Sequence, residues 1–562
     1  MNVAEQIQKH LHSFGIKHIF GIVGREAGTI SFDEDNETEF ILTRHEFSAG
    51  IAASSYSRFT KKPQVCFATI GPGSTNLATA LATAALDRYP LIAIAAQLET
   101  YEINYNNAHQ CVDGVSMFKS LVKFAYEIKT PEEIIPTINK ALSVSTSQPL
   151  GPSFISIPID ILMSTAVTPK NTEKNIPYLF PEQKQKKYLQ KLEKVIAMLK
   201  ASINPLIIVG DVALRTGCEA LIRKISEDLN IPVISSYSAK GALPPNHRLY
   251  YGAITPYMDS ILEFPALQSI FSPPDLLLLF GYDLVEHLYP KLWDTGNHKK
   301  IIRISPFPNN TPHALRTDID VVCSLKEGLE YLINQTHFMP KKKEYKILNL
   351  KKRMKQMEND NKIHIEGVLP NQVLGILNKH YDDYILANDV GLHRHVSALF
   401  YRANKPLDFV TSAGLSSFGT GLPLAIGAKI ANPQRTVVVI AGDGGFHSNS
   451  GELETAVRLG LKIIILIFNN GQSGLIQRYQ IMNNKRVNKN ITAFQPVNFA
   501  ALAKANYCQG LKISTTKELN SALKSADAYN GPTLIEIPIY YPGLYVNKYT
   551  KNYHINKKDE SS

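Results

Sequence analysis

The sequence predicts an α/β protein made of three doubly wound parallel-sheet domains. Runs of aliphatic and β-branched residues alternate with helical stretches along most of the chain, which is the pattern of parallel sheets. The 562 residues are enough for three or four domains of ordinary size. Two lysine-rich linkers, residues 166–190 and a helical segment at 340–360, divide the chain. We therefore expect domains at residues 1–165, 190–340 and 361–545, and a tail at residues 546–562.

Composition excludes several classes of protein. A hydrophobic fraction of 44% with 19% charged residues is typical of a globular chain with a large core. The longest aliphatic runs, such as residues 463–468, are too short to span a membrane. Residues 1–15 have the pattern of an amphipathic helix ended by glycine and lack the apolar block of a signal peptide. We therefore expect a soluble, cytoplasmic protein without a membrane partner.

The charge and the cysteines point to no special partner. The formal net charge is +11, but much of it lies in lysine runs at residues 184–187, 341–346 and 351–353, without interleaved aromatic residues. Such runs favour solvated linkers and faces over nucleic-acid binding. The five cysteines are scattered and form no CxxC pair, so neither a zinc site nor a disulfide framework is predicted.

In the first domain, predicted strands at residues 18–24, 40–43, 65–70 and 91–96 precede polar loops. Glu46 opens a helix after the second strand, where a glutamate usually complements the helix dipole. The sequence GPGSTN at residues 71–76 follows the third strand and could be an ordinary strand-to-helix loop. His109 and Gln110 lie in a predicted loop, and such a pair is more often ordinary surface than catalytic. Taken singly, these residues indicate no chemistry.

The middle domain has predicted strands at residues 205–210, 232–236, 275–281 and 300–305 and is again Rossmann-like. The glycine-rich GxGxxG sequence is missing after its first strand, so independent dinucleotide binding is not expected.

The third domain carries the strongest signal. Residues 436–472 predict a strand at 436–440, a Gly-Asp-Gly-Gly turn, a helix at 451–459, a strand at 462–468 and then two asparagines. Parallel strands end at a shared edge, so Asp443 and Asn470 can face one ligand, and their oxygens suit Mg²⁺ or Ca²⁺. Gly444 and Gly445 allow close backbone approach, and the helix offers N–H groups to an anion. The alternative is an ordinary turn and loop; the pattern as a whole predicts a metal-bridged diphosphate site.

Together, GDGG with the two asparagines, Glu46 in TRHEFSAG, and GPGSTN resemble thiamine-diphosphate enzymes, and the resemblance runs from residues 23–28 to 534–538. It implies a pyrimidine-binding first domain, a diphosphate-binding third domain, and the cofactors thiamine diphosphate and Mg²⁺. It implies that Glu46 protonates the aminopyrimidine, whose amine then removes the thiazolium C2 proton. It also implies that Phe418 wedges beneath the two rings, while the Ser416 carbonyl accepts from the aminopyrimidine.

The resemblance also supplies the expected ligand sets. The metal ligands are Asp443, Asn470 and the backbone carbonyl of Gln472. The cofactor-contacting residues are Glu46, Gly71, Asn76, Val390, Gly391, Leu392, His393, Ser416, Ser417, Phe418, Asp443, Gly444, Gly445, Asn470, Gln472, Ser473, Gly474 and Leu475. The resemblance further implies a homodimer or homotetramer whose active sites lie between subunits. The substrates it implies are small molecules.

Within the family, the His-Gln-Cys run at 109–111 and the YMD…FPALQ block at 257–268 look most like carboxyethylarginine synthase. That resemblance implies a transferase that condenses glyceraldehyde 3-phosphate with an amino acid to give an N-carboxyethyl amino acid. Arginine is one candidate for the amino acid. The alternative is acetolactate synthase, which decarboxylates pyruvate and joins the product to a second molecule. FAD is not expected, because the arginine-rich segment with which acetolactate synthases hold it is missing after residues 276–281.

The transferase interpretation assigns substrate roles to several residues. His109 and Gln110 would be catalytic, transferring protons to the reacting carbonyl oxygen or hydrogen-bonding it. Arg394 would meet the substrate phosphate as a permanently charged, bidentate donor. Asp283 would pair with a cationic substrate, Tyr251 would flank it, and Leu475 would face it; capping or packing is the alternative role of Asp283 and Tyr251. The tail diverges from the family, so the acceptor amine is left open.

Overall fold

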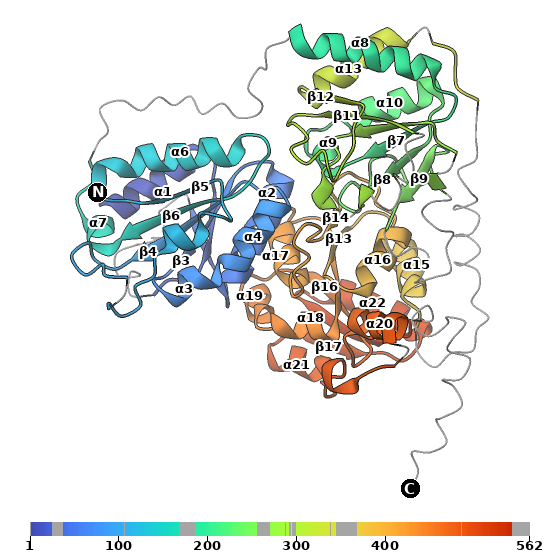
Figure 1. Ribbon diagram of the computed structural model, residues 1–562. Coiled ribbons are helices and arrows are strands. Elements are labelled where there is room, and N and C mark those ends of the chain that lie inside the picture. The colour runs from blue at the N-terminus through green and yellow to red at the C-terminus, as the bar shows by residue number, and fades with distance from the viewer. Residues whose placement is uncertain are drawn as a thin grey trace.

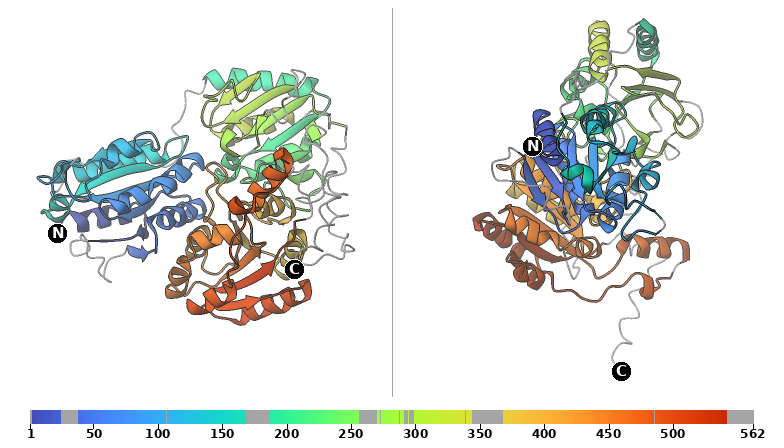
Figure 2. Two further views of the ribbon diagram at one scale, coloured as in Figure 1. Left: turned by 60° about the horizontal axis from the view of Figure 1, so that its bottom comes forward. Right: turned by 90° about the vertical axis from the view of Figure 1, so that its left-hand side faces the viewer.

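The computed structural model describes residues 2–24, 38–105, 107–167, 186–255, 270–271, 273–286, 288–290, 294, 299–337, 339–343, 368–484 and 486–541. It contains three sheets of six parallel strands, each covered by helices on both faces (Figures 1 and 2). The predicted α/β class with three doubly wound parallel sheets is therefore confirmed. The predicted tail at 546–562, the helical linker beyond residue 343, most of the first linker and the block at 257–268 lie outside the described residues.

The first sheet has the strand order β2-β1-β3-β4-β6-β5. Its strands are β1 (His18–Gly21), β2 (Glu39–Leu42), β3 (Gln64–Ala68), β4 (Leu91–Gln97), β5 (Phe124–Glu127) and β6 (Ser153–Pro158). Its helices are α1 (Val3–Ser13), α2 (Glu46–Thr60), α3 (Pro72–Asn76), α4 (Ala78–Leu86), α5 (Gly114–Phe118), α6 (Ile134–Thr146) and α7 (Ile159–Met163). The strands β3, β4 and β6 are buried along their whole length, as expected for a parallel sheet with both faces covered.

The middle sheet has the order β12-β11-β10-β7-β8-β9. Its strands are β7 (Pro205–Val209), β8 (Val233–Ser235), β9 (Tyr250–Ala253), β10 (Leu276–Phe280), β11 (Lys300–Ser305) and β12 (Ile319–Val322). Its helical elements are α8 (Lys186–Ala201), α9 (Asp211–Arg215), α10 (Glu219–Leu229), the 3₁₀ turn η3 (Leu284–Glu286) and α13 (Leu325–Thr336).

The third sheet has the order β14-β13-β15-β16-β18-β17. Its strands are β13 (Ile385–Asn388), β14 (Phe409–Val410), β15 (Val437–Gly442), β16 (Ile463–Asn469), β17 (Gln509–Lys512) and β18 (Thr533–Pro538). Its helices are α15 (Pro370–His380), α16 (Leu392–Phe400), α17 (Gly421–Ala431), α18 (Asp443–Ser448), α19 (Glu452–Arg458), α20 (Gly474–Asn484), α21 (Phe499–Ala505) and α22 (Thr516–Ala528).

The Gly-Asp-Gly-Gly sequence differs from its prediction. It is not a free turn: β15 continues to Gly442, and α18 begins at Asp443 itself. Gly442 is still extended, and the Asp443 carboxylate accepts from the Gly444 N–H at 2.9 Å, so the chain enters the helix without an intervening loop. The predicted helix at 451–459 is present as α19.

The first and third domains pack together through α2 and α17 (Figure 1). A hydrophobic core joins Ala52 of α2 with Ala425 of α17, and Ser55 Oγ donates to the Leu424 carbonyl at 2.6 Å. The helices approach so closely that a Cβ on Gly427 would lie 2.0 Å from the Ala52 carbonyl oxygen. Glycine is therefore needed where these two domains meet.

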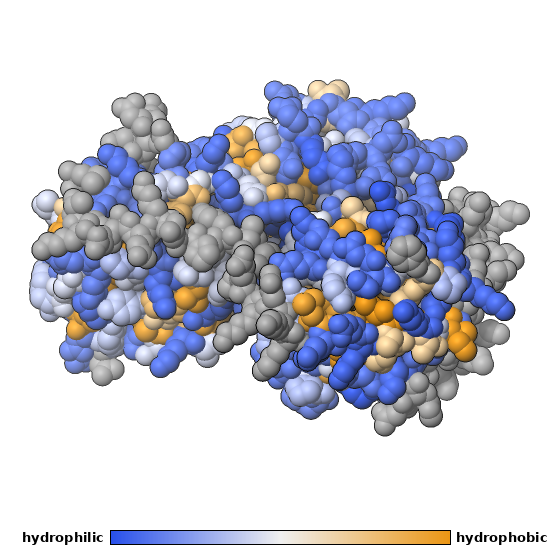
Figure 3. Space-filling model, turned by 90° about the horizontal axis from the view of Figure 1, so that it is seen from above, coloured by the Kyte–Doolittle hydropathy of each residue, from blue (hydrophilic) through white to orange (hydrophobic). Residues whose placement is uncertain are grey.

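The surface is mostly hydrophilic, with hydrophobic residues gathered in separate patches on the face seen in Figure 3. Among the described helices, none combines the length and the apolar composition needed to cross a bilayer.

Candidate functional site

A cavity of about 410 Å³ lies where three neighbouring strands of the third sheet, β13, β15 and β16, end. Among the described residues, those that line it all belong to the third domain. They are Val390, Gly391, Leu392, His393, Ser416, Phe418, Gly442, Asp443, Gly444, Gly445, Phe468, Asn470, Gln472, Ser473, Gly474, Leu475, Ile476, Phe494 and Tyr541. The structure therefore brings together the three segments 390–393, 443–445 and 470–475 with the loop that carries Phe418.

One end of the cavity has the donor set of a hard cation. Asp443 is buried, and its Oδ2 has no hydrogen-bond partner among the described residues. Burial raises the pKa of this carboxyl, so a bare carboxylate is disfavoured here unless a cation neutralises it. Asn470 and Gln472 line the same cavity. These oxygens fit Mg²⁺, whereas the described residues form no cluster of three His, Cys, Asp or Glu side chains.

The adjoining wall is shaped for close backbone approach. A Cβ on Gly445 would lie 2.5 Å from Asp389 Oδ2, and a Cβ on Gly444 would lie 2.9 Å from the Phe494 ring. Both glycines belong to the first turn of α18, whose N–H groups have no backbone carbonyl partner within the helix, although that of Gly444 donates to the Asp443 carboxylate. This wall fits a diphosphate group bridged to the cation.

Asp389, which sequence reasoning missed, holds two of the lining segments together. Its fully buried carboxylate accepts from the backbone N–H of Val390 at 2.7 Å, of Gly419 at 3.1 Å and of Thr420 at 3.1 Å. Burial outweighs these bonds and raises the pKa of Asp389 to about 6. The signal that could have found it is the one used for Asp443, a polar residue just after a buried strand.

The rest of the cavity is apolar or neutral. Burial lowers the pKa of His393 to about 3, so its imidazole is neutral, and its buried Nε2 has no hydrogen-bond partner among the described residues. Phe418 is 61% exposed at the cavity, although it is a large apolar side chain. Ser417, between Ser416 and Phe418, is half-buried and is not part of the lining. Phe468, Phe494 and Tyr541 complete the apolar lining and were not predicted.

A second group of predicted residues meets in the first domain. Glu46 is buried at the start of α2, and its Oε2 accepts from Asn76 Nδ2 at 3.0 Å. A Cβ on Gly71, which has a φ of +58°, would lie 2.7 Å from the Gln110 carbonyl oxygen. His109 and Gln110 are exposed beside this group. Within one chain, none of these residues is part of the described lining of the third-domain cavity.

Three predicted substrate residues lie elsewhere. Arg394 is 2% exposed and donates to the Ser412 carbonyl and to Ser416 Oγ, so its guanidinium lies behind the cavity wall. Tyr251, on β9, packs against the core shared by the middle and third domains. Asp283 pairs with Arg88 at 2.8 Å and lines another cavity, at the junction of the three domains.

Three family models match the chain in order. They describe the N-terminal TPP binding domain (residues 1–117), the central domain (192–332) and the C-terminal TPP binding domain (389–537) of thiamine pyrophosphate enzymes. The chain is 30% identical to the probable acetolactate synthase large subunit of Methanocaldococcus jannaschii, over 96% of this chain and 92% of that protein. It is 26% identical to the acetolactate synthase of Bacillus subtilis, over 96% of this chain and 93% of that protein.

A solved structure shares the fold. The thiamine diphosphate-dependent 4-hydroxybenzoylformate decarboxylase of Rhodococcus jostii RHA1 aligns with a TM-score of 0.82 and 21% identity, covering 96% of this chain and 99% of that one. At this identity the likeness shows the fold alone.

The comparisons correct the predicted activity. The prediction of a carboxyethylarginine synthase-like transferase is contradicted, because curated relatives that match over 93–96% of the chain are named acetolactate synthases, which was the alternative. The prediction relied on selected stretches, such as residues 109–111 and 257–268, whereas these relatives match along almost the entire chain. Three matched domains in order and a 30% identical relative over almost the full length show that the chain belongs to the thiamine pyrophosphate enzyme family.

Proposed function

We propose that the protein is a thiamine-diphosphate- and Mg²⁺-dependent enzyme that decarboxylates pyruvate and joins the two-carbon product to a second 2-oxo acid, as an acetolactate synthase does. The observation that carries the cofactor part is the buried, unpartnered Asp443 Oδ2 beside Asn470 and Gln472. The relatives named acetolactate synthase support the reaction.

The cavity residues would hold the cofactor in two parts. Asp443, Asn470 and the Gln472 backbone carbonyl would bind Mg²⁺, and the first turn of α18 with Gly444 and Gly445 would bind the diphosphate. The organic part would be bound by three segments, residues 390–393, 416–418 and 473–475. When bound, thiamine diphosphate supplies a nucleophilic carbon and an electron sink for the decarboxylation.

The residues of the chain would position groups and move protons. The buried Glu46 carboxyl would hold a proton against the pyrimidine ring, and Asn76 would fix its orientation through Oε2. His109 and Gln110 would hydrogen-bond the carbonyl oxygen of the reacting acid. Leu475, in the lining, would face the substrate. Asp389 would act indirectly, by fixing the two loops on either side of the cavity.

A complete site would need two chains. The Glu46 group lies in the first domain, while the described residues that line the cavity all belong to the third domain. Exposed apolar side chains line the open side of the cavity, since Phe418 is 61% and Phe494 is 48% exposed. A homodimer or homotetramer in which the first domain of one copy covers the cavity of another would join the two groups. Because several relatives are named large subunits, a smaller subunit is a further candidate partner.

The test is a product assay with purified protein, thiamine diphosphate, Mg²⁺ and pyruvate, with and without a second 2-oxo acid. We expect CO₂ release and a 2-hydroxy-2-alkyl-3-oxo acid, identified by mass spectrometry. Asp443→Ala should abolish both product formation and the cofactor-induced rise in Tm, whereas Glu330→Ala, on the exposed face of α13, should change neither. Aldehyde without the condensed acid would make the protein a decarboxylase, and bound cofactor without pyruvate consumption would refute the proposed substrate.

A further inference from the structure

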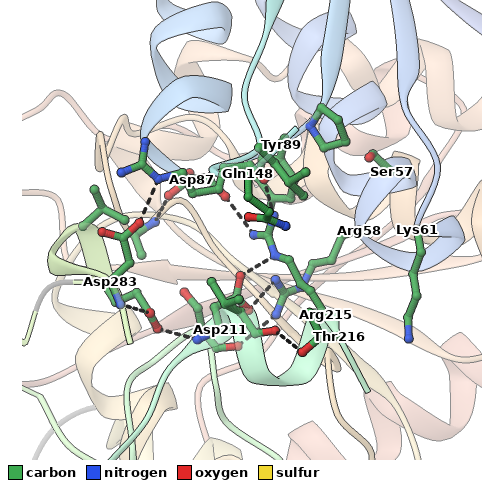
Figure 4. A pocket seen from close by; sticks show the side chains of 18 of the residues that line it. Ser57, Arg58, Lys61, Asp87, Tyr89, Gln148, Asp211, Arg215, Thr216 and Asp283 are labelled. Carbon is green, nitrogen blue, oxygen red and sulfur yellow. Dashed lines mark hydrogen bonds and ion pairs between the residues drawn. The ribbon is translucent and has the colours of Figure 1, made fainter. Parts of the chain in front are cut away.

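The topology of the middle domain defines a position at which sheets of this kind usually bind a ligand. Along the sheet, β7 continues to β8 and β9 on one side, while β10 to β12 extend on the other. The carboxyl ends of β7 and β10 therefore form a topological switch point, where open α/β sheets bind nucleotides. A cavity at the junction of the three domains lies here, lined by Asp211, Asp283 and Glu286 of this domain (Figure 4).

The backbone N–H groups at the switch point are already used by a side chain of the chain itself. Glu286 is 4% exposed, and its Oε2 accepts from the Asp211 N–H, at the start of α9, at 2.7 Å. The same Oε2 accepts from Ser236 Oγ, and Oε1 accepts from the Asp283 N–H at 2.8 Å. One carboxyl therefore bridges the loops after β7, β8 and β10, as a ligand phosphate would.

Three of the four described cations that line the cavity, the arginines, are bonded to carboxylates within the chain, whereas Lys61 is exposed (Figure 4). Arg58 of α2 donates to Asp211 at 2.8 Å, and Arg215 donates to the other oxygen of Asp211 at 2.5 Å. Arg88 pairs with Asp283 at 2.8 Å. Each of these three guanidinium groups is therefore already bonded to a carboxylate of the chain, with Arg58 and Arg215 sharing that of Asp211.

The remaining space is small for a nucleotide. The cavity holds about 80 Å³, against about 300–1,000 Å³ for the pockets that bind ligands of drug or cofactor size. The backbone is also closely packed at this point, because a Cβ on Gly210 would lie 2.3 Å from the Gly281 carbonyl oxygen.

We propose that the Glu286 carboxyl takes the place of a nucleotide phosphate at the switch point of the middle domain, so that the chain binds no flavin nucleotide there. The flavin that acetolactate synthases carry against this domain then has no phosphate site at the ends of β7 and β10. Glu286 instead helps to fix Asp211, which anchors α2 of the first domain through Arg58. This proposal concerns the middle domain and does not depend on the substrate of the enzyme.

The first experiment measures flavin in the full-length protein, purified with thiamine diphosphate and Mg²⁺ from flavin-replete cells. We expect no flavin absorbance or acid-released flavin fluorescence above a blank, and no change in Tm when FAD is added. Flavin near one per chain, or a rise in Tm with added FAD, would overturn the proposal.

The second experiment removes the internal carboxyl. In Glu286→Ala, two buried N–H groups and one hydroxyl lose their acceptor, so Tm should fall by about 5 °C or more. Inorganic phosphate should then raise the Tm of Glu286→Ala more than that of the natural protein. Glu286→Gln, which keeps one acceptor oxygen, should show a smaller fall and a smaller phosphate effect.

Glu330→Ala serves as the surface control and should leave Tm and the phosphate response unchanged. If Glu286→Ala does not fold, Glu286→Gln carries the comparison. A Glu286 variant as stable as the natural protein, or an equal phosphate response in both, would overturn the proposal.

Discussion

Gly427→Ala tests how the first and third domains are held together. The new Cβ would lie 2.0 Å from the Ala52 carbonyl oxygen and 3.0 Å from the Ser55 Cβ, across the contact between α17 and α2. Carbon and oxygen atoms need about 3.3 Å, so one helix must move by roughly 1 Å or more. The obstacle is backbone, which cannot rotate away as a side chain can.

The magnitude follows from two opposing contributions. Overpacking of this kind costs about 3 kcal/mol, at the upper end of the usual range, because backbone must shift. Replacing a helix-interior glycine by alanine returns about 1 kcal/mol. The net loss of about 2 kcal/mol should lower Tm by roughly 4–8 °C. Because α17 begins directly after the loop of Phe418, we also expect weaker binding of thiamine diphosphate.

The assay is thermal unfolding followed by circular dichroism, with a matched control. Gly375→Ala lies inside α15, where a new Cβ would meet no atom within 4 Å. This substitution should raise Tm slightly, by roughly 1–4 °C, through helix propensity alone. If Gly427→Ala is as stable as Gly375→Ala, close packing of α2 on α17 does not determine the domain contact.

Three further predictions concern buried polar groups. Glu46→Gln should retain the cofactor-induced rise in Tm but lower turnover by about 100-fold or more; unchanged turnover in a steady-state assay would remove its proposed role. Asp389→Asn places an amide against the backbone N–H groups of Gly419 or Val390, so an unpaired buried donor should cost about 1–3 kcal/mol in urea unfolding and weaken cofactor binding. An unaltered midpoint would contradict this. Burial lowers the pKa of Lys240 to about 7 from 10.5, so the folded protein binds fewer protons than the unfolded chain between these values, and stability should rise with pH across this window. Lys240→Met should reduce that rise in urea titrations at several pH values; an identical pH dependence would refute it.

Strand prediction succeeded for most of the buried strands inside the sheets. The sheet interiors β3, β4, β10 and β16 were predicted because continuous aliphatic runs mark them. The strands β5, β9, β12, β14 and β17 were not predicted; all are sheet edges of two to four residues. So short a segment with a mixed burial pattern carries little periodicity, and its place is decided by the strand beside it. The interior strands β6 and β18, each six residues long and almost fully buried, were missed as well.

The part of the third-domain cavity that lies at strand ends could be predicted from the amino-acid sequence, because its residues follow the strands directly. Asp443, Gly444 and Asn470 are brought together by one local rule, that neighbouring parallel strands end at the same edge. Their residue types then determined the chemistry that the edge can bind.

The tertiary structure decided how residues distant in the sequence meet. Arg394 is turned into the wall by the carbonyl of Ser412, and Asp283 is taken up by Arg88 from the first domain. Glu46 lies apart from the cavity, although its motif belongs to the same family signature. These outcomes depend on how whole domains pack and on which charges pair at their junctions, and neither hydrophobic periodicity nor motif spacing contains that information.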